Sequence, residues 1–316
     1  MTRPGANVFS PHAGGSSPGE ERPLRTKKRR PPSRGSADSS WMTSLTFPFR
    51  TETLLTIGVM TVLYTFLMLI RYAYASPVMM SPRFVVGVIF IMLLIQGYFW
   101  HFLFQVLRTA AYNEPDLPMT ADWDPEGIIY DLLIAVQCTV VSFLPLIGYV
   151  VFQLAPDLLA HPFVALLIAF LGMVNLPFLL LMAVTHLPDL VRAMVEISPT
   201  LPWLVIALIV LSGLYLPMAL LAAVLHQTVR AALPWHVIPA MLRVRWAYVE
   251  TLILVVGVGG LGVFLQVLAG YVPILGEFIK WFIVFAGHTA VMHRLGAMYY
   301  VHRRALDWFP EGPRVI

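Results

Sequence analysis

The sequence has little charge and almost no cysteine. Only 12% of its 316 residues are charged, whereas a soluble globular domain carries about 25%. The single cysteine, Cys138, stands inside an apolar run, so cysteines provide neither a disulfide framework nor a thiolate metal site. A Walker phosphate loop, an H-E-x-x-H motif and a G-x-S-x-G motif are all missing. No long polar loop is available to house a catalytic domain, so an enzyme is the least favoured functional class.

Apolar residues, in contrast, make up 58% of the chain and gather in long continuous runs. About 20 apolar residues in a helix cross the hydrocarbon core of a bilayer. Apolar runs in which polar residues do not alternate with apolar ones favour helices over strands. We therefore expect an all-α, polytopic transmembrane helix bundle. The predicted segments are 54–74, 84–107, 128–154, 162–185, 203–225, 248–271 and 274–300.

The distribution of Lys and Arg predicts the orientation, because basic residues favour the cytoplasmic side. The connectors 154–162 and 270–276 contain no Lys or Arg, whereas 226–246 and the C-terminal stretch are basic. With both termini inside, six spans satisfy this pattern. Segment 162–185 would then be re-entrant, since Pro177 can break it into two halves. Seven spans with an outside C-terminus is the alternative.

The N-terminal residues 1–46 form a basic tail with eight Lys or Arg and three acids. Residues 1–40 are rich in Gly, Ser, Pro and charge, a composition typical of disorder. The basic cluster at 25–34 favours a cytoplasmic tail and can attract anionic headgroups. A nucleic-acid patch finds no support in aromatic residues or in the fold class, so we expect no nucleic-acid partner. Residues 47–316 form the predicted multi-spanning membrane domain.

An acidic connector precedes the third segment. Asp124, Pro125 and Glu126 are typical of a helix start, with an N-cap, a proline at the first position and an acid in the first turn. A calcium loop is disfavoured, because its twelfth position would be Leu133 instead of a bidentate Glu. A looser acidic binding surface remains open. Its candidate residues are Asp116, Asp122, Asp124 and Glu126.

A second connector, 226–246, mixes Arg with aromatic and aliphatic residues. Such a composition is typical of a helix lying in the membrane interface with Arg and Trp at headgroup depth. The functional alternative is a lipid headgroup site formed with the basic tail. The candidate residues are Arg230, Trp235, Arg243, Arg245 and Trp246.

Ionisable and polar residues inside the apolar segments are functional candidates, because they are costly in lipid. They are His101, Gln137, His288 and His293. The two last histidines are five residues apart and do not share a helix face, so a metal site and other cofactors are not expected. Ordinary hydrogen bonds to a carbonyl or a glutamine are the simpler interpretation.

Two ion pairs are also predicted from spacing. Glu277 and Lys280, three residues apart, can pair on one helix face, and Glu250 can pair with Arg243 or Arg245 nearby in the sequence.

A G-x-G-x-x-G pattern occupies residues 257–262. The dinucleotide fingerprint needs a preceding strand, and here the pattern lies within an apolar segment. We therefore interpret it as a site of close helix packing or a hinge.

Several short motifs occur in a recognisable order. They are an acidic connector opening the third segment, Tyr215-Leu216-Pro217, a Pro-Trp-x-Val-Ile helix, Tyr248, the ending Arg294-Leu295-Gly296-Ala297-Met298-Tyr299, and the tail Ala305-Leu306-Asp307-Trp308-Phe309. Over residues 48–309 the chain resembles an uncharacterised polytopic membrane family of bacteria and archaea, catalogued as domain of unknown function four thousand and thirteen. The segment 162–185 is extra relative to a six-span pattern. The resemblance implies no activity, ligand or catalytic residue.

The leading hypothesis is a non-enzymatic membrane-organising or lipid-interacting protein of the bacterial inner (cytoplasmic) membrane. Membrane lipids are the expected partners, and a homo-oligomer remains open. The alternative is a transporter of a small solute or lipid, with Pro145, Pro177 and Pro217 marking discontinuous helices. A hydrophilic cavity lined by His101 and Gln137 would favour the transporter.

Cysteine accessibility in intact cells tests the number of spans. A cysteine at position 160 should react with an impermeant external reagent in both topologies. A cysteine at position 273 should react only in the six-span topology, which is the expected result. An unreactive cysteine at 273 beside a reactive one at 160 would establish seven spans.

Overall fold

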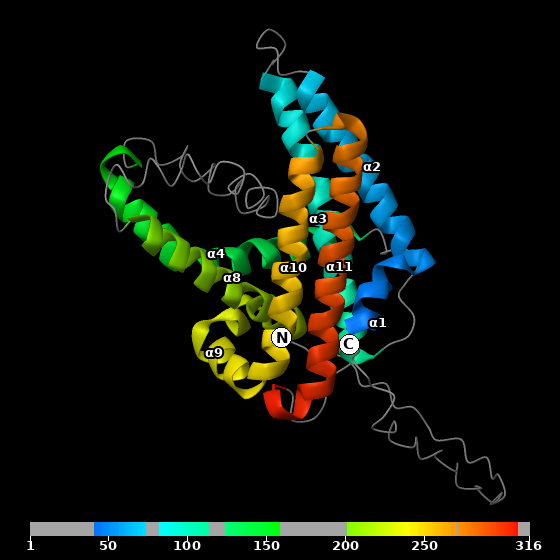
Figure 1. Cartoon of the computed structure of the whole chain (residues 1–316). Helices are drawn as coiled ribbons and strands as arrows, with labels where there is room; N and C mark the ends of the chain where they lie inside the picture. Colours follow the sequence, from blue (N-terminus) through cyan, green and yellow to red (C-terminus); the bar gives the residue numbers. More distant parts are fainter. Residues whose placement is uncertain (1–40, 74–81, 114–123, 159–200, 270, 309–316) are drawn as a thin grey trace, which may run out of the picture. The chain divides into compact units, whose positions relative to one another are not determined.

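The computed structural model describes residues 41–73, 82–113, 124–158, 201–269 and 271–308. All secondary structure in these ranges is helical (Figure 1). The elements are α1 (Trp41–Thr46), the 3-10 helix η1 (Phe47–Phe49), α2 (Thr51–Ala73), α3 (Pro82–Tyr112), α4 (Pro125–Leu158), α8 (Leu201–His226), the 3-10 helix η3 (Val229–Ala232), α9 (Pro234–Arg243), α10 (Arg245–Ala269) and α11 (Pro273–Leu306).

The long helices have the length and composition of membrane spans, which indicates a multi-pass membrane protein, all-helical over the ranges given above. Six of the seven predicted segments lie in α2, α3, α4, α8, α10 and α11; the seventh, 162–185, lies outside the described residues. By length and apolar composition, five stretches can cross a membrane, and α2 adds a shorter apolar stretch, Thr51–Leu67. The five are Phe90–Tyr112, Pro125–Tyr149, Trp203–His226, Arg245–Gly262 and Ile274–Leu306.

Helix α11 is a central element of the fold, because helices from both ends of the described chain pack on it. It contacts α1, α2, α3 and α10, and Figure 1 shows it running beside α10. Its 34 residues extend over about 51 Å at 1.5 Å per residue, which exceeds the roughly 30 Å of a hydrocarbon core. One end of α11 must therefore reach beyond the apolar layer.

Two glycines of α11 allow its close contacts. A Cβ at Gly296 would lie 2.4 Å from the Leu107 carbonyl oxygen and 2.9 Å from the Ala111 nitrogen, both in the backbone of α3. A Cβ at Gly287 would lie 2.3 Å from a methyl of Val258 in α10. Side-chain volume is thus excluded at both positions, which lets helices approach closely, as is common in membrane bundles.

The G-x-G-x-x-G pattern contributes less to packing than the sequence suggests. A Cβ at Gly257, Gly259 or Gly260 would meet nothing within 4 Å, and one at Gly262 would meet only Val284 at 3.8 Å. Within the described residues, the prediction of close packing therefore fails at three of the four glycines. The close approach between α10 and α11 depends instead on Gly287.

The first described residues pack onto the same helix. The sequence groups residues 41–46 with the basic tail, but they form α1, which contacts α11. The hydroxyl of Ser44 lies 3.1 Å from Nδ1 of His293, and the Phe47 ring stacks on the His293 imidazole with centroids 4.2 Å apart. Through His293, α11 thus contacts α1 and η1.

Helices α4 and α8 form a second packed pair that includes the connector after α8. The Cys138 thiol of α4 lies 3.9 Å from the Ala219 carbonyl of α8, and Tyr130 donates a 2.5 Å hydrogen bond to the Gln227 carbonyl. Both helices remain continuous through Pro145 and Pro217. The prediction that these prolines divide their helices is therefore wrong, and Pro177 lies outside the described residues.

The glycine contacts predict a contrast between two substitutions. Gly296→Ala should lower the free energy of unfolding by about 1–3 kcal/mol, because the new methyl overlaps the backbone of α3. Gly260→Ala is the matched control, and it should leave stability unchanged or slightly higher, since its Cβ meets no atom within 4 Å. Thermal unfolding in detergent measures both. Equal melting temperatures for the two variants would contradict the packing assigned to Gly296.

Candidate functional site

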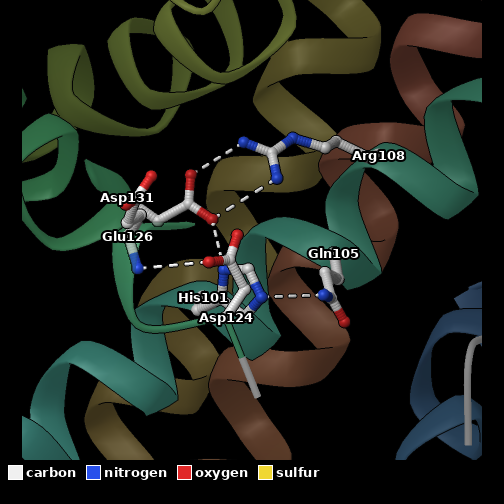
Figure 2. A network of polar contacts seen from close by, with 6 residues as sticks. All are labelled: His101, Gln105, Arg108, Asp124, Glu126 and Asp131. Carbon is white, nitrogen blue, oxygen red and sulfur yellow. Dashed lines mark hydrogen bonds and ion pairs between the residues drawn. The ribbon is translucent and has the colours of Figure 1, made fainter. Parts of the chain in front are cut away.

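A network of polar side chains joins α3 to α4. Asp131, in the second turn of α4, is only 2% exposed. Its carboxylate lies 2.7 Å from Nδ1 of His101 and 2.8 Å from Nη2 of Arg108, both on α3 (Figure 2). A buried carboxylate is stable only when its charge is paired and its oxygens are hydrogen-bonded, and here two cationic or donating groups converge on it.

The geometry of α3 explains why these groups meet. His101, Gln105 and Arg108 are separated by four and three residues, so their side chains emerge on one helix face. The amide nitrogen of Gln105 lies 2.9 Å from Nε2 of His101. Because an ionised carboxylate only accepts hydrogen bonds, Nδ1–H donates to Asp131 and Nε2 accepts from Gln105. Arg108 supplies the charge opposite to that of Asp131.

The start of α4 brings Asp131 into register with His101. Asp124 accepts a 3.2 Å hydrogen bond from the backbone N–H of Glu126 and caps the helix, which confirms the predicted cap. A Cβ at Gly127 would lie 2.6 Å from an Asp124 carboxylate oxygen and 3.4 Å from the His101 ring. The absence of a side chain at Gly127 leaves room for the capping carboxylate of Asp124, while the His101 ring lies at ordinary contact distance. Asp116 and Asp122 of the predicted acidic surface lie outside the described residues.

Sequence reasoning selected His101 but missed Asp131 and Arg108. A signal was present, because Asp131 is the only acid between Glu126 and Asp157 in a strongly apolar stretch. An isolated carboxylate in such a stretch predicts a buried cationic partner. The pairing itself joins two helices, so no spacing rule reveals it.

The second connector carries an exposed apolar face. On α9, Val237 and Ala240 are buried against the protein, whereas Trp235, Ile238 and Leu242 are 65%, 48% and 69% exposed. The exposed residues recur at spacings of three and four and thus share one face. We define the α9 surface as Trp235, Ile238, Leu242, Arg243, Arg245 and Trp246, all of which are exposed.

Arginines border this surface, and one of them ties it to α11. The Arg243 guanidinium donates a 3.0 Å hydrogen bond to the Leu306 carbonyl at the end of α11. The Arg245 guanidinium lies 5.6 Å from the centre of the Trp246 ring. The predicted interfacial residues of this connector are therefore brought together at one end of α11, with Arg230 in η3 as the remaining member.

Hydroxyl groups of two tyrosines hold the connector in place. Tyr215 of α8 donates to the Ala232 carbonyl, and Tyr248 of α10 donates to the Leu214 carbonyl. Leu214 lies within one turn of Pro217, which has no backbone N–H. The Tyr-Leu-Pro motif and Tyr248 therefore have a structural role, because they anchor the chain on both sides of α9.

A groove of about 310 Å³ lies between α4 and the connector. Gln137 lines it but His101 does not, so this groove is not the cavity lined by both residues that would favour a transporter. The lining residues are Tyr130, Leu133, Ile134, Gln137, Gln227, Thr228, Val229 and Arg230.

Of the two ion pairs predicted from the sequence, one is confirmed and the other is wrong. Glu277 and Lys280 form the predicted ion pair, and both side chains are buried. Glu250 pairs instead with Arg294, at 2.7 Å, so its predicted pairing with Arg243 or Arg245 is wrong.

His288 makes a hydrogen bond to a carbonyl of its own helix, as its Nδ1 lies 2.7 Å from the Val284 oxygen. Among the described residues, no three His, Cys, Asp or Glu side chains gather closely enough to hold a metal ion. The chain matches no protein-family model, no curated protein and no solved structure.

The network predicts strong coupling between Asp131 and Arg108. Asp131→Ala should destabilise the protein by about 3 kcal/mol or more, because the Arg108 charge then loses its partner. Arg108→Met should also destabilise it, and the double variant should cost less than the sum of the two. A double-mutant cycle of unfolding free energies in detergent measures this coupling. Strict additivity would show that the pair contributes nothing jointly.

Proposed function

We propose that this protein is a lipid-interacting integral membrane protein of the bacterial cytoplasmic membrane, which binds anionic headgroups through the α9 surface. The observation that carries the proposal is the exposed apolar face of α9 beside Arg243 and Arg245. The basic connector and the resemblance to bacterial and archaeal membrane proteins favour the cytoplasmic membrane.

Burial energetics support a membrane position for this face. Leaving a large apolar side chain in water instead of burying it forfeits about 1.5–3 kcal/mol. Trp235, Ile238 and Leu242 would all incur this cost on a water-facing surface. A helix that packs one face on the protein and inserts the other into the headgroup boundary avoids it.

The charges near α9 support a preference for anionic lipid. Arg243 and Arg245 border the face, and Arg303 and Arg304 lie in the last turn of α11, where α9 makes contact. Each basic residue near an anionic membrane surface contributes about 1 kcal/mol of attraction. From its charge alone, the basic stretch at 1–40 is expected on the cytoplasmic side.

A six-span topology with both termini in the cytoplasm fits this surface. The support for this topology is that α2 packs antiparallel to α11. Ser44 and Phe47 contact His293, whereas Tyr64 contacts Trp281 and lies 5.0 Å from the Phe285 ring centre. The start of α2 and the end of α11 therefore lie toward the same side, which supports an even number of spans.

The proposal is tested with a probe on α9. Cys138 is the only cysteine, so Cys138→Ala with Ile238→Cys gives a single labelling site for a fluorophore. Lipids carrying a quencher at the headgroup should quench it more than lipids quenched at the chain end. Quenching by headgroup-labelled phosphatidylglycerol should also exceed that by phosphatidylcholine.

Arg245 provides the charge test in the same protein. Arg245→Gln should reduce the phosphatidylglycerol preference by up to about fivefold at low salt, whereas Arg245→Lys, which keeps the charge, should retain it. Equal quenching by the two lipids would refute the preference for anionic headgroups, and quenching by aqueous iodide alone would refute lipid binding by the α9 surface.

A further inference from the structure

The groove between α4 and the connector is lined by both apolar and polar residues. Leu133, Ile134 and Val229 provide apolar contacts. Gln137, Gln227, Thr228 and Arg230 add an amide, a second amide, a hydroxyl and a guanidinium. A concave site that combines apolar walls with a few converging polar groups is the usual form of a small-ligand site.

Two of these polar groups are poorly placed for contact with hydrocarbon. Gln137 is exposed on the face of α4 that also exposes Ile129, Leu133 and Leu144, so its neighbours on that face suit lipid chains. Arg230 is exposed, and no described acidic side chain forms an ion pair with it. A polar group in an apolar environment needs a partner. An anion with further hydrogen-bonding oxygens would pair with the Arg230 guanidinium and accept a hydrogen bond from the Gln137 amide.

The connector residues that line the groove are already held in place by hydrogen bonds within the protein. The hydroxyl of Tyr130 holds the Gln227 carbonyl, and the N–H of Thr228 donates to the Ala223 carbonyl at 3.1 Å. Gln227 adopts a positive φ of 50°, which turns the chain sharply after α8. The Thr228 oxygen accepts a 3.4 Å hydrogen bond from the N–H of Arg230, so its hydroxyl hydrogen remains free to donate. Ligand binding therefore requires little ordering of the connector.

We propose that this groove holds the headgroup and glycerol portion of one anionic phospholipid. Arg230 and the Thr228 hydroxyl bind the phosphate oxygens, and the Gln137 amide donates to an ester carbonyl. The acyl chains continue along the exposed face of α4 that includes Leu133 and Leu144. The site is separate from the α9 surface and rests on the proposed lipid-binding function, to which it adds a single, stoichiometric lipid.

Native mass spectrometry of the full-length protein tests the site. The protein is extracted mildly, delipidated, and titrated with phosphatidylglycerol. We expect one retained lipid in the unmodified protein. Arg230→Gln should weaken its binding by about tenfold, because a charge-assisted hydrogen bond is lost, and Arg230→Lys should restore most of it. Leu133→Trp, which fills the groove, should also remove the lipid.

Matched controls separate this site from general effects. Val256→Trp adds the same ring at an exposed position of α10, outside the groove lining and away from the α4 face, and should leave the retained lipid in place. Arg245→Gln removes a nearby charge that does not line the groove and should also leave it in place. Because Arg230→Gln is a surface substitution, it keeps the test valid if Leu133→Trp fails to fold.

The outcomes distinguish the two proposals. A retained lipid that survives both Arg230→Gln and Leu133→Trp would overturn the groove site, while the quenching of the probe on α9 judges the proposed function independently. Displacement of the lipid by millimolar inorganic phosphate or glycerol phosphate would identify a free phosphate as the ligand and overturn the phospholipid assignment. No displacement is expected.

Discussion

The close approach of α11 to α3 at Gly296 is the constraint on which the rest of the structure depends. With backbone atoms of α3 less than 3 Å from where a side chain would begin, α11 reaches a depth at which it also contacts α1, α2 and α10. The hydrogen bond from Arg243 to the end of α11 then fixes α9. A larger residue at position 296 would displace the helix that gives these elements their common support.

The apolar environment also determines how the polar side chains are arranged. Asp131, Glu277 and Glu250 each find a cationic partner on the same or a neighbouring helix. A buried pair adds little net stability compared with a well-packed apolar pair, but a single unpaired charge is costly. The network of His101, Arg108 and Asp131 therefore specifies how α3 and α4 pair. The connector and its groove, in contrast, expose polar groups such as Gln227, Thr228 and Arg230.

Local chemistry explains which features the sequence could predict. The long apolar runs predicted six of the described helices, Asp124 predicted the start of α4, and the spacing of Glu277 and Lys280 predicted their pair. Each of these depends on neighbours within one helix turn. The partners of Asp131 and Glu250 could not be predicted, because they lie 23 to 44 residues away on other helices. The predicted close packing at the glycines of 257–262 was largely wrong for the same reason. Whether a glycine permits close packing depends on which face of its helix meets another helix.

The bond between Arg243 and the Leu306 carbonyl has a mechanical consequence. It links a helix whose outer face suits the headgroup region to the final turn of a helix that crosses the bilayer. When the lipid layer thins or is stretched, the headgroup plane moves relative to the protein's midpoint. Helix α9 can follow that plane only by straining this bond or by drawing the end of α11 with it. With α9 at the headgroup plane, as we propose above, bilayer thickness and the position of α11 would be coupled through this bond.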